Sequence, residues 1–486
     1  MVFLDQALRA ASPRYSPPPT PLASVLIHGA VVGLWVGLFV SAFWLHGLFA
    51  WSVGVVYVVY DTALLLFVTW QTRELWRLRP ATPLTGAHGS VGVIVAAYNE
   101  AAVLPITLAT LLEQTAPPDQ ILIADDGSTD ETPAMLRRLY GLLPPAIGTA
   151  SAPSPDHPSL RWVRLPHAGK ARALNGALLL METDTVITVD ADTLLDRKAI
   201  GVMRHAFSSE PQLVAATGVL TPVCGPSTAG RVLHWFQTYE YIRNFLSRYA
   251  WARVDSLLLI SGAFAGFRRQ ALLDVGGFDP DCLVEDYELI HRLRRYGATH
   301  RLGWRTAVLG RAQARTAAPS TLATFLRQRG RWFGGFLQTQ YWYRDMVGDR
   351  RYGWLGIAML PVKAIDTLQP IYGLSALVVL FAHLLTGRLS IVGLIAGVIG
   401  IKLAIDLTFH LWSIHLYRRW VGGQTGTHLG YAVLAALAEP FSFQILRHGG
   451  AALGWLLFLT GRRGWGRQSR LGLVAEADPV SNAPRG

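Results

Sequence analysis

Charged residues are scarce in this chain. They make up 16% of its 486 residues, and the mean hydropathy is +0.30, which argues against a fully soluble protein. Cysteine is also rare: Cys224 and Cys282 lie far apart, without the spacing of metal ligands or of a disulfide framework. Free thiols in a reducing, cytoplasmic setting are therefore expected. The N-terminal stretch lacks the small-residue cleavage pattern of a secretory signal, and no internal repeat is evident.

Acidic residues are outnumbered by basic ones, 32 against 44, which gives a net charge of +12. The basic excess lies beside apolar segments, at 73–79, 418–419 and 462–470, and not on one periodic face. This placement is typical of cytoplasmic loops that follow membrane segments. It predicts the lipid bilayer as a partner, with an attraction for nucleotide diphosphates, and it argues against nucleic acid.

Long apolar runs occupy both ends of the chain. A cytoplasmic tail (1–21) precedes two predicted transmembrane helices in 22–72, at 22–45 and 48–70, each long enough to cross about 30 Å of hydrocarbon. Apolar segments resume in a C-terminal membrane region, 353–461, before a basic cytoplasmic tail, 462–486. Within that region 428–461 reads either as one crossing plus an interfacial piece or as two short crossings. We therefore expect four to six membrane segments in a multi-pass protein of a bacterial-type inner membrane, with the polar middle in the cytoplasm.

The polar middle, 88–318, has a different pattern. Short apolar runs at 91–97, 120–124, 161–165 and 185–189 alternate with helical stretches at 101–115, 130–141 and 169–181. This alternation predicts an α/β domain whose mostly parallel sheet is covered on both faces. The segment that follows, 319–345, is rich in Trp, Phe and Arg and is typical of helices lying at a membrane interface.

Polar side chains follow several of these strands, at the edge where parallel sheets bind ligands. They are Tyr98, Asn99 and Glu100 after the first strand, Asp125 and Asp126 after the second, and Asp190 and Asp192 after the fourth. Any one of them could be a turn or capping residue, but their recurrence favours a binding site. Asp190 and Asp192 present oxygen ligands suited to Mg²⁺ or Mn²⁺, either of which would neutralise a diphosphate. Lys170 opens a helix and either binds phosphate there or is simply solvated.

The motifs together resemble the family 2 processive glycosyltransferases, and most closely the bacterial poly-N-acetylglucosamine synthase type. The resemblance covers roughly 90–340 and rests on YNE (98–100), DDGSTD (125–130), HAGKARALN (167–175), DAD (190–192), ISGAFAGFRR (260–269), VGGFD (275–279), ED (285–286) and QRGRW (328–332). It implies a GT-A nucleotide-binding fold, a UDP-sugar donor and a growing glycan as acceptor.

The resemblance also implies roles for single residues. Tyr98, Glu100 and Asp126 match uridine-binding positions, Lys170 lies in the nucleotide loop, and Asp190 and Asp192 match the metal and diphosphate motif. Glu285 and Asp286 match the catalytic motif, with Asp286 as the base. Ser261 and Gly262 match a segment beside the acceptor. Gln328, Arg331 and Trp332 match the QxxRW motif, in which Arg contacts the diphosphate and Trp stacks on the acceptor sugar. Two departures stand out: Val284 replaces the usual Thr, and no C-terminal gating motif of the FxVTxK kind is found.

The expected activity is therefore that of an inverting hexosyltransferase, which polymerises a UDP-sugar, with UDP-N-acetylglucosamine favoured, into a β-linked exopolysaccharide and translocates it. The alternative is a non-processive enzyme that adds one sugar to a lipid carrier. Lys363 with Asp366, and Lys402 with Asp406, have spacings that allow intrahelical ion pairs, which either line a glycan channel or are self-neutralised structural pairs. The sequence leaves open the donor sugar, the linkage, the product length, the oligomeric state and any export or regulatory partner.

Overall fold

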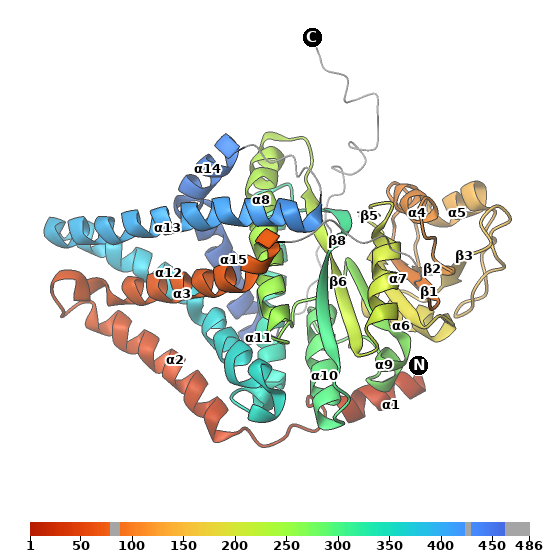
Figure 1. Ribbon diagram of the computed structural model, residues 1–486, viewed down its shortest axis with the longest axis horizontal. Helices are drawn as coiled ribbons and strands as arrows, with labels where there is room; N and C mark the ends of the chain where they lie inside the picture. Colours follow the sequence, from red (N-terminus) through yellow and green to blue (C-terminus); the bar gives the residue numbers. More distant parts are fainter. Residues whose placement is uncertain (78–87, 423–428, 462–486) are drawn as a thin grey trace, which may run out of the picture.

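The computed structural model describes residues 1–77, 88–422 and 429–461, so the expected basic tail at 462–486 lies outside the described residues. Figure 1 shows a sheet-containing domain at one end of the molecule and long helices that reach away from it towards the other end. The segment expected as a plain tail contains helix α1 (Val2–Ala11), whose Leu4 and Leu8 are buried. The backbone of α1 lies against Gly276, so the N-terminus is docked on the sheet domain.

One mixed sheet of eight strands forms the core of that domain, in the order β3-β2-β1-β4-β7-β6-β8-β5. Its first half is parallel and confirms the predicted strands: β1 (Val91–Ala97), β2 (Gln120–Asp125), β3 (Leu160–Arg164) and β4 (Thr185–Asp190). Because β1, β2 and β4 are buried along nearly their whole length, both faces of this half are covered. The intervening helices are α4 (Leu104–Leu112), α5 (Thr132–Tyr140) and α6 (Lys170–Leu180).

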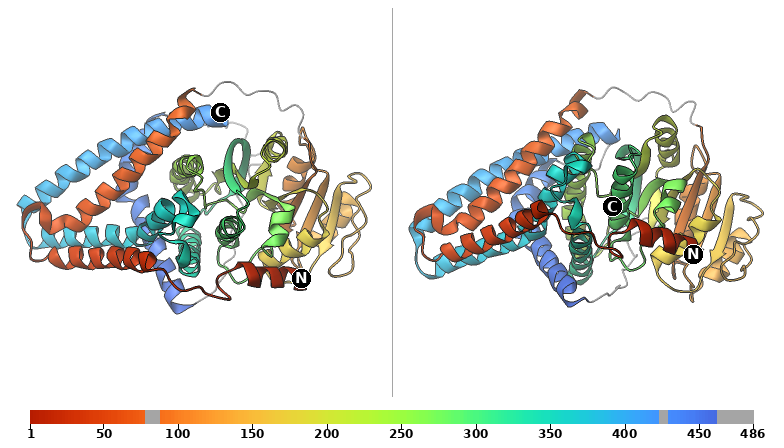
Figure 2. Two further views of the ribbon diagram at one scale, coloured as in Figure 1. Left: turned by 60° about the horizontal axis from the view of Figure 1, so that its bottom comes forward. Right: turned by 90° about the horizontal axis from the view of Figure 1, so that it is seen from below.

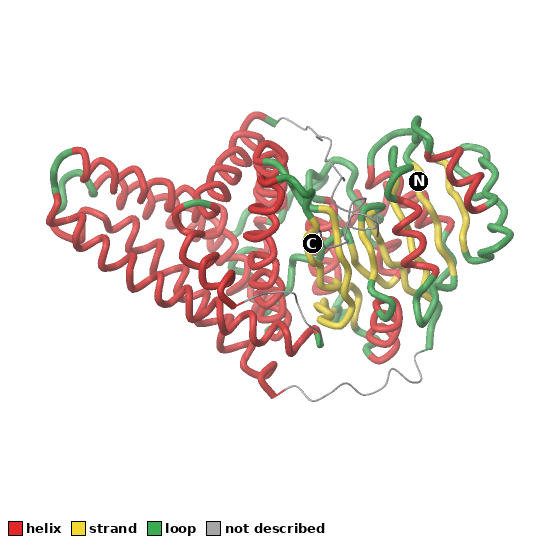
Figure 3. Tube along the Cα trace, turned by 90° about the horizontal axis from the view of Figure 1, so that it is seen from above, coloured by secondary structure: helices red, strands yellow, loops and turns green. Residues whose placement is uncertain are grey.

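The second half of the sheet departs from the parallel pattern. β7 (Phe264–Arg268) runs antiparallel to both β4 and β6 (Leu213–Val223), while β8 (Arg305–Ala317) pairs in parallel with β6 and antiparallel with the short β5 (Thr193–Leu195). The remaining helices of the domain are α7 (Ala199–Ser209), α8 (Thr228–Arg253), α9 (Arg269–Asp274) and α10 (Glu285–Thr299). Figure 3 shows the strands gathered on one side of the molecule and helices filling the other.

Four helical segments are long and apolar enough to cross a membrane. They are α2 (Leu22–Ser41), η1 with α3 and η2 (Gly47–Arg77), η5 with α12 (Leu355–Leu385) and α13 (Leu389–Val421). Both views in Figure 2 show these helices extending together away from the sheet. These four candidates match the lower number of the four to six membrane segments expected from the sequence.

The ambiguous block 428–461 forms two helices that meet at a bend of 48°. α14 (Leu429–Ala438) is too short to cross a bilayer by itself, and α15 (Phe443–Thr460) follows the turn at η6 (Glu439–Phe441). The bent pair counts as one span at most, which gives up to five candidate spans among the described residues. The reading of this block as two separate crossings, and hence of six in all, is not supported.

The predicted interfacial segment forms α11 (Leu322–Trp342), which packs along α15 through glycines on both helices. A Cβ atom on Gly454 would lie 2.8 Å from the nitrogen of Gly334 and 2.9 Å from the oxygen of Gly330, and one on Gly450 would lie 2.5 Å from Cβ of Arg329. Small residues four apart let two helix backbones approach closely. This contact fixes the position of the QRGRW segment against the C-terminal helices.

Candidate active site

The strand-end loops of the parallel half are held by their own side chains. Asp125 accepts the backbone N–H of Ser128 at 2.8 Å on Oδ1 and the indole N–H of Trp162 at 3.1 Å on Oδ2, so its carboxylate shapes the turn after β2. Glu100 is buried after β1, and its backbone N–H donates to Oγ1 of Thr132 at 3.0 Å. Asp125 is therefore structural, whereas its neighbour Asp126 lies on the cavity wall.

The carboxylate of Asp126 is surrounded by donors from the loop before α6. It accepts the backbone N–H groups of Ala168 at 2.8 Å and Gly169 at 3.0 Å, and its Oδ2 lies 2.9 Å from Nδ1 of His167. The imidazole of His167 stacks on the ring of Tyr98, with the centroids 4.1 Å apart and the planes 16° from parallel. A flat aromatic face and a fixed carboxylate thus lie side by side at this edge, an arrangement suited to a nucleobase.

Lys170, the first residue of α6, points to carboxylates on two other segments. Its Nζ lies 2.6 Å from Oδ1 of Asp190 and 3.5 Å from Oε1 of Glu285. Burial lowers the pKa of Lys170, but the two carboxylates outweigh it and the net pKa is raised, so the ammonium group stays protonated. Burial raises the pKa of Glu285, with Lys170 opposing and Asp286 adding to the rise. Lys170 is therefore not a solvated lysine; it joins the end of β4 to the start of α10.

Asp190 is the last residue of β4, and the chain turns directly after it into β5. The backbone N–H of Asp190 donates to the carbonyl of Ala263 at 3.2 Å, and the carbonyl of Asp192 accepts the N–H of Ala317 at 3.2 Å. Backbone pairing on both sides of the turn thus holds the two carboxylates at the edge of the sheet, where both line the same cavity.

Asp286 lies in the first turn of α10, held by backbone donors. Its Oδ2 accepts the N–H of Gly262 at 2.7 Å and its Oδ1 accepts the N–H of Tyr287 at 2.8 Å. A Cβ atom on Gly262 would lie 3.0 Å from Oδ2 of Asp286 and 3.1 Å from its Cβ, so only glycine permits this approach without displacement. The adjacent Ser261 is half-buried and lines the cavity beside the carboxylate.

The QRGRW segment lies on α11, and its Gln328, Arg331 and Trp332 line the same cavity as Asp286. Arg331 donates from Nη1 to the carbonyl of Leu283 at 3.0 Å, so it holds the loop that leads into α10. Trp332 is half-buried, and the Cζ atom of Arg329 lies 4.7 Å from its ring centroid. Gln328 is buried, and its Oε1 has no hydrogen-bond partner within the described residues. A buried acceptor of this kind, on a cavity wall, is placed to receive a donor from a ligand.

Val284, which stands where the resembling family has Thr, has a packing role. It is the N-cap residue of α10 and offers no side-chain cap. Its side chain is buried against Gly335 of α11, where an added Cβ would lie 2.4 Å from Cγ2 of Val284. An apolar contact thus stands in place of the hydroxyl, and it ties the loop before Asp286 to the helix that carries Trp332.

All of the predicted site residues line one cavity of about 1460 Å³, which continues between the membrane helices. Those from the sheet domain are Tyr98, Glu100, Asp126, Lys170, Asp190, Asp192, Ser261, Gly262, Glu285 and Asp286, and those from α11 are Gln328, Arg331 and Trp332. Lys363, Asp366, Lys402 and Asp406 from α12 and α13 line the same space. The cavity therefore brings together residues from the strand ends, from α10 and from the candidate membrane helices.

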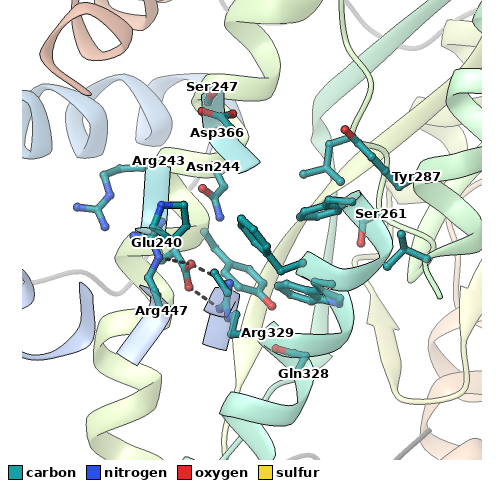
Figure 4. A pocket seen from close by; sticks show the side chains of 18 of the residues that line it. Glu240, Arg243, Asn244, Ser247, Ser261, Tyr287, Gln328, Arg329, Asp366 and Arg447 are labelled. Carbon is teal, nitrogen blue, oxygen red and sulfur yellow. Dashed lines mark hydrogen bonds and ion pairs between the residues drawn. The ribbon is translucent and has the colours of Figure 1, made fainter. Parts of the chain in front are cut away.

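The sequence reasoning missed the contribution of α8. Glu240 on this helix accepts both Nη1 of Arg329 at 2.9 Å and Nη2 at 2.6 Å, and Nε of Arg447 lies 3.3 Å from it (Figure 4). Arg243, one turn further along α8, pairs with Glu439 at 2.5 Å. These ion pairs join α8, α11 and α15 around the cavity. The only signal in the sequence was the charge spacing in an otherwise aromatic stretch.

The two aspartates of the DAD turn fit a divalent cation shared with a ligand. Among the residues that the structure describes, no group of three His, Cys, Asp or Glu side chains is arranged to hold a metal by itself. Mg²⁺ is commonly bound by one or two carboxylates together with substrate phosphates and water. Asp190 and Asp192 provide carboxylates of that kind on the cavity wall.

Comparison with known proteins agrees with this geometry. The family profile described as "Glycosyltransferase like family 2" matches residues 88–335, which is half of the chain. The poly-beta-1,6-N-acetyl-D-glucosamine synthase of Staphylococcus aureus strain COL is 27% identical over 288 residues, covering 59% of this chain and 61% of that protein. The enzyme of the same name from Staphylococcus epidermidis is 29% identical over 248 residues, covering 50% and 54%. The matches thus span less than two thirds of these relatives.

A solved structure shares the fold. The mannosyltransferase PcManGT from Pyrobaculum calidifontis, in complex with GDP-Man and Mn²⁺, aligns with a TM-score of 0.54 and 21% identity, covering 81% of this chain and 99% of that one. The likeness identifies the mixed sheet and its flanking helices as a GT-A-like glycosyltransferase fold, carried on a chain with several candidate membrane helices.

Proposed function

The chain belongs to glycosyltransferase family 2, and from this we propose that it is an inverting membrane synthase that polymerises a UDP-sugar into a β-linked exopolysaccharide. UDP-N-acetylglucosamine is the favoured donor, because the relatives reported above carry the name of poly-β-1,6-N-acetylglucosamine synthases. In this proposal the catalytic domain lies in the cytoplasm of a bacterial-type cell, against its inner membrane.

Asp286 acts as the base. Its carboxylate, held by the N–H groups of Gly262 and Tyr287, takes the proton of the acceptor hydroxyl, whose oxygen then attacks C1 of the donor sugar. The bond from C1 to the diphosphate breaks as the new glycosidic bond forms. Displacement on the face opposite the diphosphate turns an α-linked donor into a β-linked product. Trp332 offers the acceptor ring a flat face on the same cavity wall.

The donor binds at the strand-end edge. Tyr98 and Asp126 receive the uracil, and Lys170, protonated beside Asp190, attracts the diphosphate. Asp190 and Asp192 would hold Mg²⁺ or Mn²⁺, which supplies neutralising charge for the departing diphosphate. Arg331 and Lys170 add fixed positive charge from the protein itself.

The continuous cavity is the observation that carries the polymerase proposal. It extends from Tyr98 and Asp190, past Asp286, to Asp366 and Lys402 on the helices that are apolar enough to cross a membrane. A single transfer to a lipid carrier needs no such extension, whereas a growing glycan must leave the base as it lengthens. The extension therefore favours processive synthesis with translocation, with an export partner receiving the product.

Purified protein in detergent tests the proposal. Each UDP-sugar, with GDP-mannose as a comparison, is supplied with Mg²⁺ or Mn²⁺, and nucleotide release and product size are followed together. We expect UDP release with UDP-N-acetylglucosamine, loss of release in EDTA, and long products. Products extended by a single sugar would favour the lipid-carrier alternative, and nucleotide release from GDP-mannose alone would overturn the choice of donor.

A further inference from the structure

Arg248, on α8, differs from the other charged side chains on the membrane side of the cavity. The ion pairs there are Lys402 with Asp61 and Asp406, Lys363 with Asp366, Arg329 and Arg447 with Glu240, and Arg243 and Arg447 with Glu439. Arg248 lines the same cavity, but its Nε and Nη1 atoms are buried without a hydrogen-bond partner in the part of the chain that the structure describes.

The surroundings of Arg248 do not supply the hydrogen bonds that its Nε and Nη1 atoms lack. Its Cζ atom lies 4.4 Å from the ring centroid of Phe245, so the guanidinium group covers an aromatic face of its own helix. Burial lowers the pKa of Arg248 to about 10, opposed by Tyr241 and Asp286, and the group stays charged at neutral pH. A guanidinium group with two buried donor atoms that form no hydrogen bond is unfavourable. It is expected where a ligand completes its hydrogen bonds.

The neighbours of Arg248 in the cavity indicate which ligand would complete its hydrogen bonds. Glu240, Asn244, Ser247 and Arg248 share the face of α8 that lines the cavity, and Figure 4 shows Asn244 and Ser247 around the same space as Gln328. Arg248 lines the same cavity as Asp286, and the negative charge of Asp286 raises the pKa of Arg248 against the effect of burial. In the proposed function, the terminal sugar of the acceptor occupies this place.

We propose that Arg248 binds the terminal sugar of the acceptor, donating hydrogen bonds from its guanidinium group to oxygens beside the hydroxyl that Asp286 deprotonates. The guanidinium turns from the Phe245 ring to reach them. A neutral sugar is the ligand, because the carboxylate of Asp286 already acts on the positive charge of Arg248. The inference rests on the proposed function, since it needs an acceptor that is a glycan.

Full-length variants in detergent test the assignment. Arg248→Gln removes the charge and Arg248→Lys keeps it. Arg253→Gln is the matched control, because Arg253 lies on the same helix, is exposed and pairs with Glu74 outside the cavity. The probe is a β-1,6-linked N-acetylglucosamine trisaccharide, with UDP-N-acetylglucosamine as donor. Extension rates give KM for the trisaccharide, and UDP binding is measured separately by calorimetry.

Loss of a charge-assisted hydrogen bond is expected to raise KM for the trisaccharide about 10- to 100-fold in Arg248→Gln. UDP binding stays unchanged, Arg248→Lys lies closer to the wild type, and Arg253→Gln matches it. An unchanged KM for the trisaccharide in Arg248→Gln overturns the inference, and so does an equal weakening of UDP binding, which would place Arg248 at the donor or in the fold. Failure of the wild type to extend any probe would instead refute the proposed function, before any variant is made.

Discussion

The backbone N–H of Gly262 donates a 2.7 Å hydrogen bond to Oδ2 of Asp286, and an added Cβ on Gly262 would lie within 3.0 Å of the same oxygen. Gly262, which lies just before β7, thus supplies the hydrogen-bond donor and, because it has no side chain, also the space that the carboxylate of Asp286 occupies. The main chain therefore orients the proposed base, since within the described residues both hydrogen bonds to its carboxylate come from backbone N–H groups.

Replacing Asp286 with Asn removes the proton acceptor and keeps the shape of the side chain. Base catalysis contributes about 10²- to 10⁴-fold, so transfer should fall by at least that factor. UDP binding should remain nearly intact, because Asp286 is not among the groups around Asp126 and Tyr98. Measuring both on one preparation checks the role; a joint loss of transfer and UDP binding would mean that Asp286 is structural.

Gly262→Ala tests the close approach itself. The added methyl group would push the carboxylate of Asp286 out of its place, and a misplacement of about 1 Å can lower the rate about 10²-fold. The expected result is a lower kcat with little change in thermal stability. Gly225→Ala is the control, since its Cβ would meet Oγ of Ser320 at an ordinary 3.4 Å. Equal rates for the two variants would contradict the argument.

The glycine contact between α11 and α15 predicts a difference between nearby positions. Gly454→Ala would place its Cβ 2.6 Å from Cβ of Phe333 and 2.8 Å from the nitrogen of Gly334, whereas nothing lies within 4 Å of a Cβ on Gly449. Overpacking of this kind costs about 1–3 kcal/mol. Thermal unfolding in detergent should show a lower Tm for Gly454→Ala and an unchanged or higher Tm for Gly449→Ala, because alanine is more favourable than glycine inside a helix. Equal Tm values would mean that α11 and α15 do not pack through this face.

Asp279 should make stability depend on pH in the acidic range. Burial, with the neighbouring Glu288, raises its pKa to about 6, against the opposing charges of Arg14 and Arg292. A raised carboxyl pKa contributes stability that is present below about pH 4, the unfolded value, and is lost as the pH rises through 6. The loss is roughly 2–3 kcal/mol. Asp279→Asn stays neutral, so the stability of the wild type should fall relative to this variant between these pH values in unfolding experiments. Parallel pH profiles for the two proteins would refute the shift.

The parallel half of the fold could be predicted from the sequence because each strand is a short β-branched run followed by a helix of its own. The antiparallel half could not. The stretch that forms β7, 264–268, was recognised as a motif and not as a strand. The register of the long β6 and β8 depends on pairing between segments about 90 residues apart, which no local period reveals.

The candidate site, too, could be predicted from the sequence only in part. The rule that ligands bind at the ends of parallel strands brought Tyr98, Asp126 and Asp190 together correctly. The rule could not distinguish Asp125 from Asp126. The two carboxylate oxygens of Asp125 accept hydrogen bonds from Ser128 and Trp162. The ion-pair partners of Lys170 could not be predicted from local sequence patterns either, because Asp190 lies at the end of β4 and Glu285 at the start of α10.

The membrane part of the cavity was the least predictable from sequence spacing. Lys402 pairs with Asp406 on its own helix, as its spacing allowed, but it also lies 2.7 Å from Oδ2 of Asp61 on α3. Lys363 pairs with Asp366 at 2.7 Å, and Asp366 accepts the hydroxyl of Tyr60 at 2.5 Å. Both sets of ion-paired residues line the cavity, so they would also line the proposed path of the glycan.

Substitutions in the group of Asp61, Lys402 and Asp406 can separate these two roles. Lys402→Leu alone leaves two carboxylates facing each other without a cation and should destabilise the protein by about 3–5 kcal/mol. Replacing all three residues with Leu removes the charges of buried Lys402 and half-buried Asp61 and Asp406 together, and replacing an ion pair by apolar residues is often neutral for stability or stabilising. The triple variant should therefore unfold near the wild-type temperature, while the single variant unfolds well below it.

Product length then decides the function of the group. A saccharide moving past Asp61, Lys402 and Asp406 exchanges hydrogen bonds with polar walls, and an apolar wall leaves its hydroxyls without partners. The triple Leu variant should bind UDP normally and make much shorter polymer, as measured on a sizing gel with equal amounts of released UDP. Full-length polymer from a stable triple variant would show instead that the group is a self-neutralised structural cluster and that the glycan leaves by another route.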